Sequence, residues 1–139
     1  MATINKFEEI ISWKEARELN KILGKLIAEK RFEHNYRLIN QIEGSAGSIM
    51  DNIAEGFERG GNREFIQFLF IAKGSCGELR SQLCRALDRN YITLQEFDLL
   101  SVHAMKISSL IQKLISYLDN SEMKGVKYKG REPEQKKTS

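Results

Sequence analysis

Proline is almost absent from this sequence: Pro133 is the only one among 139 residues. A β-sandwich or β-barrel needs many turns and usually contains more proline, so the composition favours helices. No apolar run approaches the roughly 18 residues that a membrane-spanning helix requires. The first ten residues, MATINKFEEI, carry acids where a signal peptide has its apolar stretch. We therefore expect no membrane span and no secretion, and we predict a cytoplasmic protein.

Cysteine and histidine are equally scarce, with two of each. On one helix Cys76 and Cys84 would lie about 12 Å apart along the axis, too far for a disulfide, and free thiols suit a reducing cytosol. Neither histidine has a glutamate three residues before it, so the Glu-x-x-His pairs of di-iron bundles are missing. Phosphate-binding loops, dinucleotide motifs and a nucleophile beside a base are missing too. The sequence predicts a non-enzymatic protein without metal or cofactor.

The chain nevertheless has the composition of a folded protein, with 41% hydrophobic and 29% charged residues. Its net charge of +3 is unevenly distributed: residues 120–139 contain six bases and three acids, and the remaining 119 residues contain sixteen of each. The apolar pattern also stops after Asp119, where glycines, Pro133 and lysines take over. We therefore predict a folded domain over residues 1–119 and a disordered basic tail over residues 120–139.

Four segments of this domain show apolar residues spaced alternately three and four apart. The segments cover residues 12–31, 35–57, 63–89 and 97–118. The last is the most regular, with seven apolar residues from Phe97 to Leu118 in an unbroken heptad seam. Helices of this length joined by short loops predict an all-α fold, an antiparallel up-down four-helix bundle.

Capping signals mark the ends of these helices. Ser12 with Glu15, and Thr93 with Glu96, each have the spacing of a capping box. Gly60 and Gly61 break the chain between the second and third helices, and Asn62 is positioned to cap the third.

The third helix carries apolar residues on a second side. Ile66 and Phe70 lie well away from its core stripe at about 100° per residue, and a helix that is apolar all round is buried on both sides. Two exposed apolar residues could also be ordinary surface. We favour the first interpretation and predict that Ile66 and Phe70 form a homo-oligomer interface.

Polar residues form a stripe beside the apolar seam of the second helix. Ser45, Ser48, Asn52 and Glu55 are spaced three and four apart, and Ser75 and Glu78 lie beside the core of the third helix. Buried polar groups are costly unless they are paired. The pattern predicts a structural hydrogen-bond network between these two helices, and a ligand site is the weaker alternative.

Basic residues form one regular stripe, on the outer face of the first helix: Lys14, Arg17, Lys21 and Lys25. Further bases stand around the third helix and complete the candidate nucleic-acid set: Arg59, Arg63, Lys73 and Arg80. The alternative is a solvated face, since Glu18 and Glu29 lie four residues after Lys14 and Lys25 and can pair with them.

Two motifs in the middle of the chain resemble a known family. They are SIMDNIAEG from Ser48 to Gly56, and REFIQFLFIAKGSCGEL from Arg63 to Leu79. They are similar to motifs of bacterial four-helix-bundle proteins first noticed in intervening sequences of large-subunit ribosomal RNA genes. A related branch comprises the accessory variability proteins of diversity-generating retroelements. The resemblance covers about residues 7–118, including the opening Trp13-Lys14-Glu15-Ala16.

This resemblance implies a bundle that assembles into a homo-oligomeric ring, commonly a pentamer. In the retroelement branch the positively charged ring is a partner of reverse transcriptase and nucleic acid. The signature positions in this chain are read as structural: Ser48, Asn52, Glu55, Gly56, Ser75 and Glu78. One departure is Gly61, where relatives often have a serine that forms a capping box with Glu64.

Three functional hypotheses follow. The first is a non-enzymatic, ring-forming adaptor that binds RNA or DNA through its basic surfaces, with reverse transcriptase or another nucleic-acid enzyme as a possible partner. The second is an oligomeric protein-interaction scaffold with no role in nucleic-acid binding. The third, which is weaker, is a small-ligand binder or enzyme that uses the polar cluster.

Overall fold

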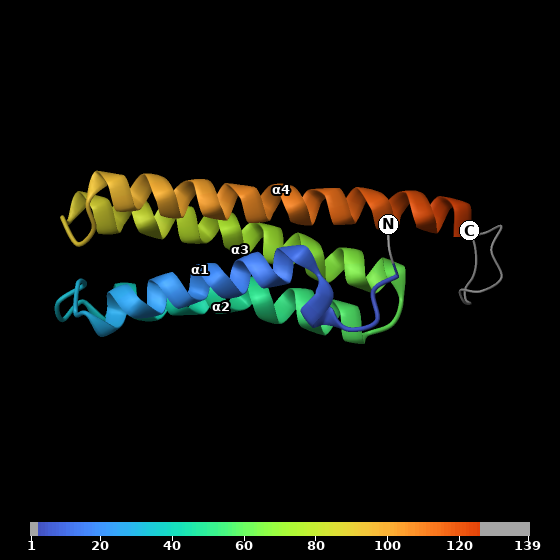
Figure 1. The fold of residues 1–139 in the computed structure, drawn as a ribbon, viewed down its shortest axis with the longest axis horizontal. Helices are drawn as coiled ribbons and strands as arrows, with labels where there is room; N and C mark the ends of the chain where they lie inside the picture. Colours follow the sequence, from blue (N-terminus) through green and yellow to red (C-terminus); the bar gives the residue numbers. More distant parts are fainter. Residues whose placement is uncertain (1–2, 126–139) are drawn as a thin grey trace.

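The fold consists of four antiparallel helices packed side by side (Figure 1). The structure is a computed structural model that describes residues 3–125, with side chains over 3–121. A short 3₁₀ helix, η1 (Phe7–Glu9), precedes the four α-helices. They are α1 (Ile11–Ala28), α2 (Tyr36–Glu58), α3 (Asn62–Asp88) and α4 (Leu94–Gly125). The predicted all-α up-down bundle is confirmed.

Each helix contacts two of the other three. α2 packs against α1 and α3, and α4 packs against α3 and α1, so that α1 and α3 occupy diagonal corners of the bundle. The short connections at each end place neighbouring helices antiparallel, as Figure 1 shows. Surfaces on the outer sides of α1 and α3 therefore face different directions.

The core is formed by the predicted seams of all four helices. Leu19 of α1, Ile49 of α2, Leu79 of α3 and Ile107 of α4 are each 0% exposed. Cys76 belongs to this core, and burial raises the pKa of its thiol to about 12. Such a thiol stays protonated at neutral pH and acts as a small apolar side chain.

Two helices begin at the residues that the sequence indicates. Asn35 caps α2 by accepting a hydrogen bond from the backbone N–H of Leu38 at 3.1 Å. Both reciprocal hydrogen bonds of the Thr93–Glu96 capping box form. The Glu96 carboxylate accepts from the Thr93 N–H at 2.8 Å, and the Thr93 hydroxyl accepts from the Glu96 N–H at 3.1 Å.

The predicted cap of the first helix is wrong. α1 begins one residue before Ser12, with Ile10 at the N-cap position and no side-chain cap. Ile10 and Ser12 are both buried, so the first turn is fixed by packing, and the Ser12 hydroxyl has no hydrogen-bond partner among the described residues. The ring of Phe7 packs edge-on against Trp13 at 5.2 Å and closes this entry.

The other helix ends differ from the prediction by a few residues. Gly61, and not Asn62, is the N-cap residue of α3, and it follows Gly60, whose φ of +89° is a conformation that favours glycine. α1 ends at Ala28, three residues before the predicted Arg31. α4 continues to Gly125, so residues 120–125 of the predicted tail are helical. Residues 126–139 of that tail lie outside the described residues.

Candidate nucleic-acid interface and neighbouring surfaces

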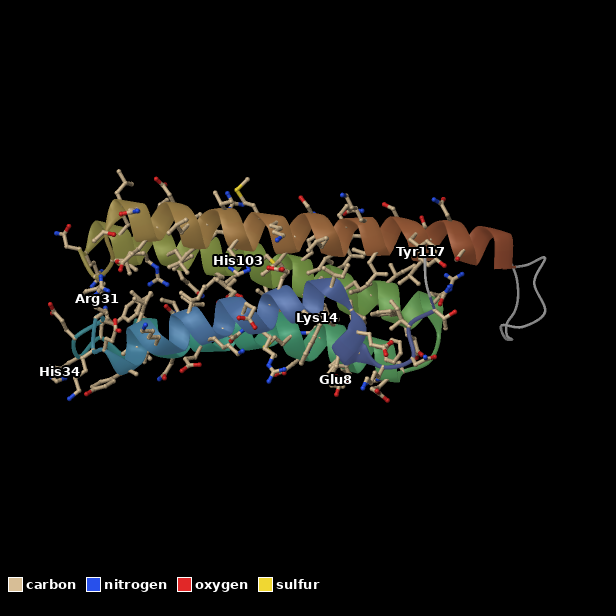
Figure 2. All side chains as sticks on the ribbon, in the orientation of Figure 1. Glu8, Lys14, Arg31, His34, His103 and Tyr117 are labelled. Carbon is tan, nitrogen blue, oxygen red and sulfur yellow. The ribbon has the colours of Figure 1, made fainter. Side chains whose placement is uncertain are left out.

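The basic stripe on α1 is exposed along its whole length. Lys14, Arg17, Lys21 and Lys25 all point to solvent, and Figure 2 shows Lys14 on this helix. Only Lys21 is paired with an acid within residues 3–121, with its Nζ 3.2 Å from Glu18. The Arg17 guanidinium lies over the Trp13 ring at 5.7 Å, which positions it without neutralising it.

The ion pairs that would have neutralised this stripe do not form. Glu18 pairs with Lys21 instead of Lys14, and Glu29 lies 3.9 Å from Arg31 instead of beside Lys25. Exposed pairs of this kind contribute at most about 1 kcal/mol. The stripe therefore presents more uncompensated positive charge than the sequence spacing suggested.

The other candidate bases do not join the stripe. Arg63 and Arg80 are exposed and Lys73 is half-buried on α3, the helix diagonal to α1, so they form a separate surface of the protomer. Arg59, just after α2, is compensated: its guanidinium donates to Glu55 at 2.8 Å and lies over the Phe68 ring at 5.0 Å.

The polar network between α2 and α3 forms around Ser48. The hydroxyl of Ser75 donates to the Ser48 hydroxyl at 2.9 Å. The Asn52 amide donates to the Ser48 carbonyl at 2.8 Å and contacts its hydroxyl at 2.9 Å. Glu55 and Glu78, which were assigned to this network, are exposed instead, because their positions on the helices face solvent.

A second buried pair extends this polar contact and includes a residue that the sequence analysis missed. The Ser45 hydroxyl donates to the Gln82 side-chain oxygen at 2.6 Å, and Gln82 is only 5% exposed. Gln82 stands between Leu79 and Ala86 with spacings of three and four, so its place on the apolar seam was the available signal.

Gly56 completes the α2–α3 contact through its lack of a side chain. A Cβ at this position would lie 2.7 Å from Cβ of Phe68 and 3.0 Å from Cδ1 of Phe65. Real Cβ atoms do not come so close, so only glycine fits between the two helices here.

The two residues that the sequence predicts for the oligomer face differ in their exposure. Phe70 is 53% exposed, but Ile66 is only partly exposed and packs against the core of its own bundle. The exposed neighbour of Phe70 is Ile71, at 52%. Within residues 3–121, the exposed large apolar residues of α3 are therefore Phe70 and Ile71.

Charged residues join α1 to α4 near the middle of the bundle. Figure 2 shows His103 between these helices, and its Nε2 lies 2.9 Å from Oε1 of Glu15. Lys106 Nζ lies 3.5 Å from the other oxygen of the same carboxylate. The hydrogen bond with His103, helped by Lys106, lowers the pKa of Glu15.

An open, largely apolar depression adjoins this charged cluster. It has a volume of about 480 Å³, and its α4 wall includes Leu99 and Val102, which are 67% and 65% exposed. Ile22 of α1, 45% exposed, forms the opposite wall. The heptad spacing does not indicate this surface, because these residues lie outside the regular seam.

A stronger ion pair lies at the end of the bundle where α1 ends and α4 begins. Arg31 donates to both carboxylate oxygens of Glu96, at 3.0 and 2.6 Å, and Figure 2 shows Arg31 at that end of the bundle. This two-pronged hydrogen bond, with the Thr93 N–H, lowers the pKa of Glu96 to about 2. The pair fastens the α1–α2 loop to the first turn of α4.

The described residues contain no cluster of three or more potential metal ligands. Nor does any helix within residues 3–125 have the length and apolar character needed to cross a membrane.

Comparison with known proteins assigns the family. No curated protein matches the sequence. A crystal structure of a protein of unknown function from the S23 ribosomal protein family of Bacteroides thetaiotaomicron matches with a TM-score of 0.68 at 22% identity. The match covers 76% of this chain and 98% of that one, and it shows a shared fold. The family described as 23S rRNA-intervening sequence protein matches residues 8–113. The chain therefore belongs to the 23S rRNA-intervening sequence protein family.

Proposed function

We propose that this protein is a non-enzymatic, ring-forming homo-oligomeric adaptor that binds RNA or DNA through the α1 stripe. Its partner in this proposal is a nucleic-acid enzyme such as a reverse transcriptase. The observation that carries the proposal is the exposed row of Lys14, Arg17, Lys21 and Lys25, of which only Lys21 has an ion-pair partner within residues 3–121. Phosphate contacts of this kind supply sequence-independent affinity.

Assembly would multiply this weak surface. One protomer offers four bases on a helix about 27 Å long, estimated at 1.5 Å per residue. A ring, expected to be a pentamer, repeats the stripe in each subunit, so several copies can contact one nucleic acid. The exposed pair of Phe70 and Ile71 supports self-association, because burying such side chains contributes roughly 1.5 to 3 kcal/mol each.

Salt dependence of binding tests the nucleic-acid half of the proposal. The logarithm of affinity should fall with the logarithm of salt concentration by about 0.7 to 0.9 per contacted phosphate. Replacing Lys14, Arg17, Lys21 and Lys25 with glutamine should reduce this slope markedly. The matched control replaces four exposed bases that are scattered over the surface: Lys6, Lys30, Arg37 and Lys113. Equal loss in both variants, or no binding by the wild type at low salt, would contradict the proposal.

Light scattering tests the assembly. Phe70→Glu should convert the oligomer to a monomer with unchanged helix content, because a buried charge without a partner is costly. Tyr36→Glu is the control, since Tyr36 is 62% exposed and lies on α2. A wild-type monomer at micromolar concentration would exclude the ring.

A second candidate function is an oligomeric protein-interaction scaffold. The observation that favours it is the apolar depression between α1 and α4, whose Leu99 and Val102 are the two most exposed large aliphatic residues on that surface. Apolar surface of this kind often marks a site of protein contact. An oligomer that binds a protein partner and no RNA or DNA would support the scaffold.

A further inference from the structure

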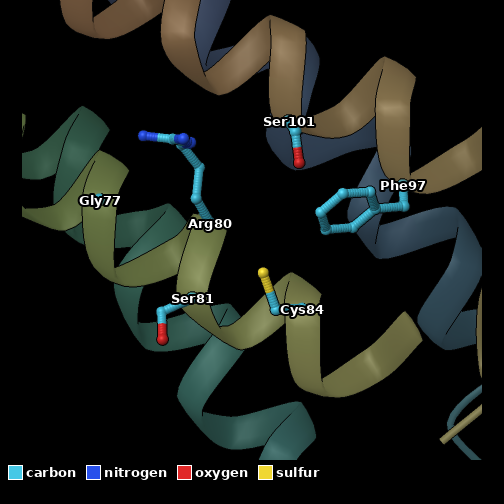
Figure 3. A pocket seen from close by; sticks show the side chains of 6 residues that line it. All are labelled: Gly77, Arg80, Ser81, Cys84, Phe97 and Ser101. Carbon is cyan, nitrogen blue, oxygen red and sulfur yellow. The ribbon is translucent and has the colours of Figure 1, made fainter. Parts of the chain in front are cut away.

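A second depression lies on the other side of α4, between α3 and α4 (Figure 3). It has a volume of about 430 Å³, within the range of small-molecule sites. α3 contributes Gly77, Arg80, Ser81 and Cys84, and α4 contributes Phe97 and Ser101. It thus combines a cation, hydroxyl groups and an aromatic ring.

Arg80 and the ring of Phe97 lie at opposite ends of this depression (Figure 3). Arg80 and Cys84 are four residues apart on α3, as are Phe97 and Ser101 on α4, which corresponds to about 6 Å along each axis. In Figure 3 Arg80 stands at one end of the space and Phe97 at the other. The Cys84 sulfur and the Ser101 hydroxyl lie between them, and the Cys84 sulfur points into the gap.

The polar groups here have no partners within residues 3–121. Arg80 is exposed and forms no ion pair or hydrogen bond with a described residue. The Ser101 hydroxyl oxygen is buried and has no hydrogen-bond partner among those residues either.

Glycine and phenylalanine give the depression its shape. A Cβ on Gly77 would meet nothing within 4 Å, so the absence of a side chain leaves this part of the space open. Phe97 is partly buried and packs against the core, so its ring is held in place. A fixed ring is a suitable stacking surface because little freedom is lost on binding.

We propose that this depression holds one nucleotide of a single-stranded nucleic acid, with the phosphate on Arg80 and the base against Phe97. The inference rests on the proposed nucleic-acid function and adds a strand preference to it. Arginine forms paired hydrogen bonds with phosphate, and any base can stack on an aromatic ring. Bases in a duplex are already paired and stacked, so only an unpaired nucleotide can enter.

The two cysteines provide a direct measurement of occupancy. Cys84 is exposed in the depression, whereas Cys76 is buried and its thiol pKa is raised to about 12, so iodoacetamide should modify Cys84 alone. A short single-stranded RNA or DNA at saturation should slow this modification several-fold. A duplex of the same length and inorganic phosphate should leave the rate unchanged. Equal protection by phosphate would indicate a simple anion site and overturn the nucleotide proposal.

Three variants test the roles of Gly77, Phe97 and Arg80 in nucleotide binding. Gly77→Met should fill the depression and weaken single-strand binding, whereas Gly44→Met, at another exposed glycine with open space, should not. Phe97→Leu keeps an apolar side chain but removes the stacking surface. It should weaken single-strand binding by about 5- to 100-fold and leave duplex binding unchanged. Arg80→Gln should lower the salt slope for single strands by about one phosphate contact.

The outcomes separate this inference from the proposed function. If Gly77→Met and Phe97→Leu bind single strands like the wild type, while the α1 variant loses binding, the pocket is wrong and the adaptor stands. Binding of uridine monophosphate to the pocket does not require the α1 stripe. This nucleotide should protect Cys84 from modification in the wild type and not in Arg80→Gln. Protection by this nucleotide in a protein that binds no RNA or DNA would overturn both the adaptor and the single-strand assignment, and would leave a mononucleotide site.

Discussion

The α2–α3 and α1–α4 contacts are made in different ways. α2 and α3 approach so closely at Gly56 that a single added carbon would meet Phe68 at 2.7 Å, and paired serines and amides fill the adjoining space. α1 and the loop that follows it are joined to α4 in part by charged groups, with His103 on Glu15 and Arg31 on Glu96, beside an open apolar depression.

This difference separates residues that maintain the fold from surfaces that are available to partners. The signature motifs that mark the family contribute Ser48, Asn52, Gly56 and Ser75 to the close contact. Gly56 has no room for a side chain, and Ser48, Asn52 and Ser75 hydrogen-bond with one another, so we read these positions as structural. The partner surfaces lie on the outer sides of the helices, where side chains are exposed.

The largest expected effect is at Gly56. Gly56→Met should destabilise the protein by about 3 kcal/mol, at the upper end of the cost of overpacking, because its side chain must displace Phe65 and Phe68. Gly44→Met is the matched control, and it should be neutral or stabilising, since nothing lies within 4 Å of that Cβ and glycine is a poor helix former. Thermal unfolding measures both. Equal stability of the two variants would show that α2 and α3 are not in close contact.

The serine network should give the next largest effect. Asn52→Ala should cost about 1 to 3 kcal/mol, because it removes the hydrogen bonds to Ser48. Ser48→Ala and Ser75→Ala, singly and together, should show a coupling energy above about 0.5 kcal/mol, since their hydroxyls are 2.9 Å apart. Additive effects in denaturant unfolding would mean that the two hydroxyls do not interact. Any loss of RNA binding beyond the loss of stability would point to a ligand site.

The same comparison explains how much the sequence could reveal. Seam residues such as Leu79 and Ile107, and the local Thr93–Glu96 cap, follow from spacing along one helix, and all three were predicted correctly. The polar stripes also indicated the α2–α3 network, but the α1–α4 contacts do not follow from such spacing. Glu15 and His103 are 88 residues apart in sequence, and Glu15 has the spacing of a capping box that the buried first turn of α1 does not use.

The contribution of the Arg31–Glu96 ion pair to the free energy of unfolding should depend on pH. Glu96→Gln keeps a side chain that can complete the capping box, so it removes chiefly the ion pair with Arg31. We expect a loss of about 1 to 2 kcal/mol at neutral pH, reduced from the full pKa shift because both side chains are about 30% exposed. Since folding lowers the pKa of Glu96 from 4.5 to about 2, this contribution is complete above pH 4.5. It should disappear as the pH falls toward 2. A stability difference that persists at that pH would assign the loss to something other than the carboxylate charge.

The smallest effect on stability is expected in the α1–α4 depression. Leu99 and Val102 are 67% and 65% exposed, so replacing both with serine removes little buried apolar area and should change the free energy of unfolding by less than about 0.5 kcal/mol. Leu100 is adjacent but only 3% exposed, and Leu100→Ser should cost several-fold more, because it leaves a cavity and a buried hydroxyl. Chemical denaturation of the three proteins tests whether the depression is surface or core. If the exposed pair destabilises the bundle as much as Leu100 does, these side chains are buried in the assembled protein. Loss of the oligomer in the double variant, measured by light scattering, would then identify a second self-association surface, whereas unchanged stability and an unchanged oligomer would leave the depression free for another protein.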